Sequence, residues 1–155
     1  MRILLVEPAY YTQYPPLGLL KFSTLYKSQG HDVRFVRGLS LLTKFVPDEI
    51  KVTSLFTWAW RPVWEAAAFY RALFPKAKLS LGGVYASLTP DHARQSGADE
   101  IMTGLINKVE DLRPDYSLVP EWHIQRSASI LFSTRGCIRK CDFCAVPALE
   151  GKPKQ

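Results

Sequence analysis

Three cysteines, Cys137, Cys141 and Cys144, lie within eight residues of one another in this 155-residue chain. Their spacing is C-x3-C-x2-C, and the sequence holds no further cysteine. An odd, tightly clustered set of thiols argues against a disulfide framework and favours a metal or redox centre. Thiolates are soft ligands that suit zinc or an iron–sulfur cluster.

The number of thiols helps to distinguish these two metal centres. A structural zinc site has four protein ligands, and His123, 14 residues before Cys137, would supply the fourth only if the intervening chain folds back. Three cysteines and an open position fit a 4Fe-4S cluster with one iron free for a small molecule. The neighbouring cations Arg135, Arg139 and Lys140 would favour deprotonated sulfur.

The motif resembles the signature of radical S-adenosylmethionine (SAM) enzymes, C-x3-C-x-aromatic-C after a buried strand, with Phe143 in the aromatic position. The resemblance implies that Cys137, Cys141 and Cys144 hold a 4Fe-4S cluster and that Phe143 packs beside the cluster and the adenine of SAM. It also implies reductive cleavage of SAM to methionine and a 5′-deoxyadenosyl radical. The expected partners are SAM, an electron donor and a substrate that the sequence does not identify.

The apolar run Ser129–Thr134 precedes the cysteines and is predicted to be the first strand of the catalytic barrel. Only 11 residues follow Cys144, whereas a complete (β/α) barrel takes on the order of 200 residues or more. We therefore expect residues 129–155 to be the incomplete start of a radical SAM domain. The chain then reads as an N-terminal fragment that does not turn over SAM by itself.

The first hundred residues alternate between strand-like and helix-like segments. Strands are predicted at Arg2–Glu7, Asp32–Arg37, Glu49–Thr57, Lys78–Leu81 and Ala98–Thr103, and helices at Leu17–Gln29, Pro62–Phe74 and Pro90–Gln95. Strands separated by helices predict βαβ units and a parallel sheet with helices on both faces. Residues 1–104 are thus expected to form a flavodoxin/Rossmann-like doubly wound α/β domain, and residues 105–128 a linker.

This first domain resembles the cobalamin-binding domain that precedes the barrel in one subgroup of radical SAM enzymes. The resemblance rests on PPLGLL at 15–20, GHDV at 30–33, and an S-x-L-like element that a Gly-Gly pair follows after 26 residues. It assigns cofactor binding to five residues: Thr53, Ser54, Leu55, Gly82 and Gly83.

One element departs from the cobalamin pattern. Domains that ligate cobalt carry D-x-H-x-x-G after the first strand, and this chain has Glu7–Thr12 (EPAYYT) there. A histidine-ligated cobalamin at that position is therefore excluded. Cobalamin bound without a protein ligand and a domain that keeps only the fold both stay open.

Composition sets the remaining limits. The 47% hydrophobic content is that of a globular protein, and no apolar run approaches the roughly 18 residues of a membrane span. We expect a cytoplasmic protein with no membrane partner. The net charge of +6 is only a weak sign of anionic partners, and nucleic acid is not expected among them. The alternative reading is a stand-alone α/β small-molecule-binding module whose cysteine tail holds zinc or a remnant cluster.

Overall fold

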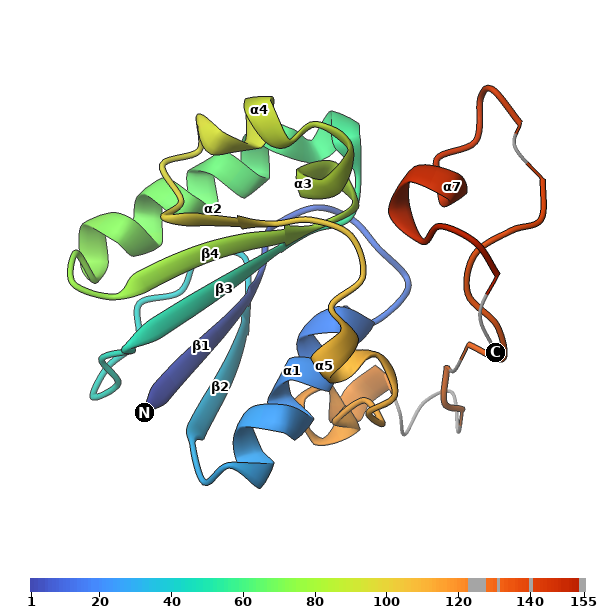
Figure 1. Cartoon of the computed structure of the whole chain (residues 1–155). Coiled ribbons are helices and arrows are strands. Elements are labelled where there is room, and N and C mark those ends of the chain that lie inside the picture. Colours follow the sequence, from blue (N-terminus) through green and yellow to red (C-terminus); the bar gives the residue numbers. More distant parts are fainter. Residues whose placement is uncertain (123–127, 131, 140, 154–155) are drawn as a thin grey trace.

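Five parallel strands form the single sheet of this computed structural model, which describes residues 1–122, 128–130, 132–139 and 141–153. The strand order is β2-β1-β3-β4-β5 (Figure 1). The strands are β1 (Arg2–Glu7), β2 (Asp32–Arg37), β3 (Glu49–Ser54), β4 (Lys78–Gly83) and β5 (Glu100–Met102). This is the flavodoxin-like order. It confirms the predicted α/β fold for the part of the chain that holds the five strands.

Helices cover both faces of the sheet (Figure 1). One face carries α1 (Leu17–Ser28), and the other carries α2 (Trp60–Leu73), α3 (Val84–Leu88) and α4 (Pro90–Arg94). The shorter elements are η1 (Thr57–Ala59), α5 (Asn107–Glu110), η2 (Tyr116–Leu118) and α7 (Val146–Leu149). None of the helices in the described part of the chain combines the length and the apolar character that crossing a bilayer requires.

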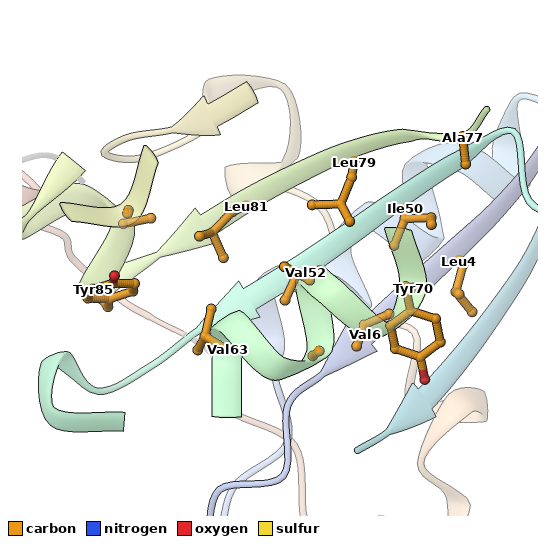
Figure 2. Packing of buried hydrophobic residues seen from close by; sticks show 14 of the residues in the cluster. Leu4, Val6, Ile50, Val52, Val63, Tyr70, Ala77, Leu79, Leu81 and Tyr85 are labelled. Atoms are coloured by element: carbon orange, nitrogen blue, oxygen red, sulfur yellow. The ribbon is translucent and has the colours of Figure 1, made fainter. Parts of the chain in front are cut away.

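The larger apolar core lies between the sheet and α2–α4 (Figure 2). Alternate residues of the central strands point into it, because successive side chains of a strand face opposite ways. The fully buried set includes Leu4, Val6, Ile50, Val52, Leu79 and Leu81 from the strands, with Val63, Tyr70 and Tyr85 from the helices. This core fixes the sheet that positions the candidate site.

The face toward α1 is divided in two. Under α1, Ile3, Leu5 and Val33 make a small apolar cluster with Leu19. On the other half, the row that continues from Leu5 runs through Lys51, Ser80 and Glu100, as the strand register shows. Three polar residues in a row are unusual on a covered sheet face. This polar half is where a cavity opens.

The segment expected to be a linker packs closely onto α1 over its described residues. Val109 and Val119 are buried. Ser23 Oγ donates a hydrogen bond of 2.6 Å to Asp115 Oδ2, and Lys27 Nζ lies 2.7 Å from the same oxygen. Residues 105–122 therefore cover the outer side of α1 and carry the chain toward the cysteines.

The described residues of Ser129–Thr134, predicted as a barrel strand, form no strand. A parallel strand exists only by pairing with a neighbour, and none of the five strands of the sheet pairs with this segment. Instead the backbone N–H of Ile130 donates a hydrogen bond of 2.7 Å to Tyr116 Oη. Leu131 lies outside the described residues. The barrel strand is thus not confirmed.

Candidate functional site

A cavity of ≈ 540 Å³ lies at the carboxyl ends of β3 and β4. Its walls include the ends of β1, β3 and β4, the loop before α1 and the start of that helix, the segment 104–110, and the C-terminal segment around Phe132 and Leu149. Most of the lining is apolar. Ligands of open parallel α/β sheets bind beyond the carboxyl ends of the strands, so this is the expected edge for a site.

The five residues predicted to bind cobalamin all line this cavity. They come together because β3 and β4 are paired, with Thr53 opposite Gly82 and Ser54 opposite Gly83. The two sequence elements, 26 residues apart in the chain, thus form one continuous wall.

The five residues do different things in that wall. Ser54 is fully buried, and its Oγ donates to the Gly82 carbonyl at 2.7 Å and accepts from the Ala86 N–H at 3.2 Å. Its hydroxyl therefore joins β3, β4 and α3 and points away from the cavity. Thr53, one residue earlier, belongs to the opposite, cavity side of the strand.

The two glycines also differ. Gly83 has φ +106°, and a Cβ there would collide with the backbone of Ser54. A Cβ at Gly82 would meet only ordinary contacts with Met102, at 3.5 Å and beyond. The absence of a side chain at Gly82 therefore leaves space in the cavity. The absence of a side chain at Gly83 permits the end of β4 to lie close against Ser54 of β3.

The polar row of β3 and β4 contributes Lys51 and Ser80 to the cavity lining. Lys51 is only 7% exposed, and its Nζ lies 3.6 Å from Glu49 Oε2 and above the rings of Phe22 and Tyr26. Sequence reasoning did not select Lys51. The signal was a charged residue in the middle of a buried strand, EIKVTS, where an apolar one is usual.

The rim of the cavity includes the segment in which cobalt-ligating domains carry histidine. Glu7 is buried there and accepts a 2.6 Å hydrogen bond from Arg37 Nε. Burial raises the pKa of the Glu7 carboxyl, while Arg37 opposes that rise. Burial and the nearby charge of Glu7 also raise the pKa of the Tyr10 phenol. Tyr14, on the same rim, is 62% exposed and lines the cavity mouth.

The three cysteines are free thiols of intermediate exposure. The Cys144 N–H donates to the Cys141 carbonyl at 3.0 Å, and the Arg139 N–H reaches Cys137 Sγ at 3.4 Å. Within the described residues, no three metal-ligating side chains come together in a group that could hold a metal. Binding a cluster therefore requires this loop to close around it.

Two further residues of the motif region can be placed. Phe143 is 94% exposed, so its ring makes no packed contact in this state. Arg135, expected to favour thiolate sulfur, is held by carboxylates instead. Its Nε lies 2.9 Å from Glu110 Oε2 and its Nη1 lies 2.8 Å from Glu150 Oε1. His123 and Lys140 lie outside the described residues.

This Arg135 network fastens the cysteine-bearing segment to the cavity. Glu150 also accepts a 2.8 Å hydrogen bond from the Gly136 N–H, and the Arg135 guanidinium sits 3.6 Å from the centre of the Phe132 ring. Arg135, Phe132 and Glu150 all line the cavity. The segment on either side of the cysteines is therefore part of the cavity wall.

Comparisons with known proteins agree with the fold. No family description and no curated protein matches the chain. A cobalamin-binding protein from Desulfitobacterium hafniense DCB-2 superimposes with a TM-score of 0.53 and 17% identity, over 78% of this chain and 58% of that one. A response regulator from Thermotoga maritima gives 0.51 and 15%, over 78% and 95%.

These likenesses define a flavodoxin-like α/β domain of the kind found in cobalamin-binding proteins and response regulators. The chain spans less than two thirds of the cobalamin-binding protein. Since two such neighbours have different roles, the fold does not select a function, and the site must do so.

Proposed function

We propose that the α/β domain binds a corrinoid, either cobalamin or a close relative, with its nucleotide tail in the cavity. One observation carries the proposal. The cavity is bounded by Thr53, Leu55 and the paired Gly82-Gly83, and the bare backbone at Gly82 keeps it open. The fold that this chain shares with a cobalamin-binding protein supports the same reading.

The lining fits such a ligand. Apolar walls suit the flat base of a nucleotide tail, and Tyr14 at the mouth offers an exposed ring for a larger planar group. No histidine of the described residues lines the cavity, and Glu7 is engaged by Arg37. A corrinoid would be held here by its tail and by the faces of its ring, without a protein ligand to cobalt.

Equilibrium dialysis tests this proposal. Cobalamin should be retained by the protein, and cobinamide, which lacks the nucleotide tail, should bind at least about tenfold more weakly, because the tail supplies the buried contacts. Equal binding of the two would place the ligand outside the cavity. Retention of neither would overturn the proposal.

For the cysteine segment, we propose that Cys137, Cys141 and Cys144 bind a 4Fe-4S cluster and that the whole protein is a radical SAM enzyme. The donor set supports it, since three free thiols lie on one short loop. When bound, such a cluster supplies the electron that cleaves SAM to methionine and a 5′-deoxyadenosyl radical. The residues of this chain hold the loop beside the cavity, through Arg135 and its two carboxylate partners.

Metal analysis after anaerobic reconstitution separates this proposal from the alternative of a zinc-bearing binding module. About four iron and four sulfide per chain are expected for the cluster. About one zinc per chain and no brown colour would overturn the cluster proposal and favour the binding module.

A further inference from the structure

Lys51 is a buried cation with unused hydrogen-bonding capacity. It lies in the middle of β3, is 7% exposed and lines the cavity. Its Nζ makes no hydrogen bond to the described residues, and its ion-pair partner, Glu49 Oε2, is 3.6 Å away. An ammonium group carries three donors. No fully buried side-chain donor among the described residues lacks a hydrogen-bond partner, so the Nζ of Lys51 is open to the cavity that it lines. A ligand that fills the cavity without an acceptor at this point would leave these donors unmet, which is costly.

The charge of Lys51, in contrast, is already balanced. Glu49 lies beside it on β3, and Glu100 lies two strands away in the same row of the sheet. Glu100 in turn pairs with Lys78 at 2.7 Å. Two carboxylates and two ammonium groups leave no net charge. A further anion would have to be desolvated without compensation, so this site calls for a neutral acceptor.

Lys51 sits at the inner end of the cavity. It precedes Thr53 by two residues on the same side of β3, which places it about 7 Å further from the mouth. Phe22, whose ring centre is 5.3 Å from Lys51 Nζ, forms a flat apolar wall there. A planar ligand that enters past Thr53 and Gly82 would therefore bring its leading edge to the ammonium group.

We propose that the cavity selects a planar ligand whose inner edge carries a neutral hydrogen-bond acceptor, which Lys51 Nζ binds. This proposal rests on the corrinoid function proposed above in so far as the ligand is a nucleotide tail. A tail base with acceptor nitrogens on its outer ring, such as adenine, is then preferred over 5,6-dimethylbenzimidazole. The two methyl groups of the latter base would leave the Lys51 donors unmet.

Binding titrations with two corrinoids test this. The dissociation constants of cobalamin and of the corrinoid with adenine as its lower base are measured for the unmodified chain, Lys51→Met and Lys78→Met. The unmodified chain should prefer the adenine corrinoid by about tenfold or more, since sites built around a hydrogen bond reject analogues that lack it. Lys51→Met should lose the preference.

Lys78→Met is the matched control, because it removes an ammonium group from the same charge cluster at a side chain that is 56% exposed and outside the cavity lining. It should keep the preference. Equal binding of the two corrinoids by the unmodified chain, or a preference that survives in folded Lys51→Met, would overturn the proposal. If Lys51→Met does not fold, the ratio of the two dissociation constants in the unmodified chain decides whether the proposal stands.

Free bases separate this proposal from the corrinoid function itself. If neither corrinoid binds, the corrinoid function fails, and titration with free adenine and free 5,6-dimethylbenzimidazole still tests Lys51. If the unmodified chain prefers adenine and Lys51→Met does not, the role of Lys51 is supported although the corrinoid function is not. Equal binding of the two bases, or no binding of either, would overturn it.

Discussion

Gly83 approaches Ser54 so closely that a side chain at position 83 would collide with the Ser54 carbonyl oxygen. The contact lies where β3 and β4 end and where Ser54 Oγ also binds the Gly82 carbonyl and the Ala86 N–H. The Gly-Gly pair thus serves two separate purposes. Gly83 permits the close approach of β4 to β3, and Gly82 leaves room in the cavity.

Alanine at these two positions should therefore give opposite results. Gly83→Ala should lower the free energy of unfolding by about 2 kcal/mol or more, through the collision and the positive φ. Gly82→Ala should leave stability within about 1 kcal/mol of the original chain and weaken cobalamin binding, because the new methyl group occupies cavity space. Urea unfolding and cobalamin titration of both variants measure this. Equal stability of the two variants would contradict this assignment of roles.

The contact of Asp115 with α1 should make the free energy of unfolding depend on pH. Burial alone would raise the pKa of Asp115, but Lys27 and the hydroxyls of Ser117 and Ser23 outweigh it and lower the pKa to about 2. The ionised carboxylate therefore stabilises the fold above its unfolded pKa of 3.8. That stabilisation is lost as the pH falls from about 4 through about 2.

Asp115→Asn should lower the free energy of unfolding at pH 7 by about 1 kcal/mol, a modest value because Lys27 is partly exposed. It should also reduce the loss of stability between pH 5 and pH 2. Asp111→Asn, at an exposed position of the same segment, is the control and should change neither quantity. Identical pH profiles for Asp115→Asn and the original chain would show that the carboxylate charge does not hold this segment.

Arg135 should control how firmly the cysteine segment is held. Arg135→Ala removes both carboxylate contacts and the cover over Phe132. Amide hydrogen exchange should then rise several-fold in residues 136–150 and stay unchanged in the sheet, because local opening needs few contacts to be broken. Arg139→Ala, at an exposed position, is the control. Equal exchange in the two variants would mean that the Arg135 network does not anchor the segment.

Serine in place of each cysteine should test the cluster proposal residue by residue. Cys137→Ser, Cys141→Ser and Cys144→Ser should each lose most of the iron and sulfide that the reconstituted chain takes up, since iron–sulfur clusters are held by thiolates, which a serine hydroxyl replaces poorly. Phe143→Ala should retain the metal and weaken SAM binding. Full iron content in any serine variant would remove that cysteine from the ligand set.

How far the sequence predicts the fold depends on how local the signal is. The strands Arg2–Glu7 and Asp32–Arg37 were predicted at their observed bounds, because apolar runs bounded by turn residues are local features. The predicted third strand runs to Thr57, but β3 ends at Ser54 and the chain has turned into η1 by Thr57. The helix Val84–Leu88 was missed because five residues are too few to show a helical period.

The sequence predicts one part of the candidate site, the part that follows from the pairing of neighbouring strands. Pairing of β3 with β4 brings Thr53 and Gly82 together, as parallel strands require. The direction of the Ser54 hydroxyl and the packing of Asp115 on α1 depend on contacts between residues about 30 and 90 positions apart. No periodicity in the sequence encodes such contacts. A charge within the buried strand EIKVTS marks Lys51 as unusual, but only the pairing of the strands shows that it faces the cavity.

The most direct test of corrinoid binding in the cavity is a nuclear magnetic resonance titration of the ¹⁵N-labelled chain with cobalamin. The largest shifts should fall on the amides of Thr53, Leu55, Gly82 and Gly83, with further shifts at Leu149 and Glu150 across the cavity. No shifts at saturating cobalamin, or shifts confined to the opposite face around α2 and α4, would contradict it.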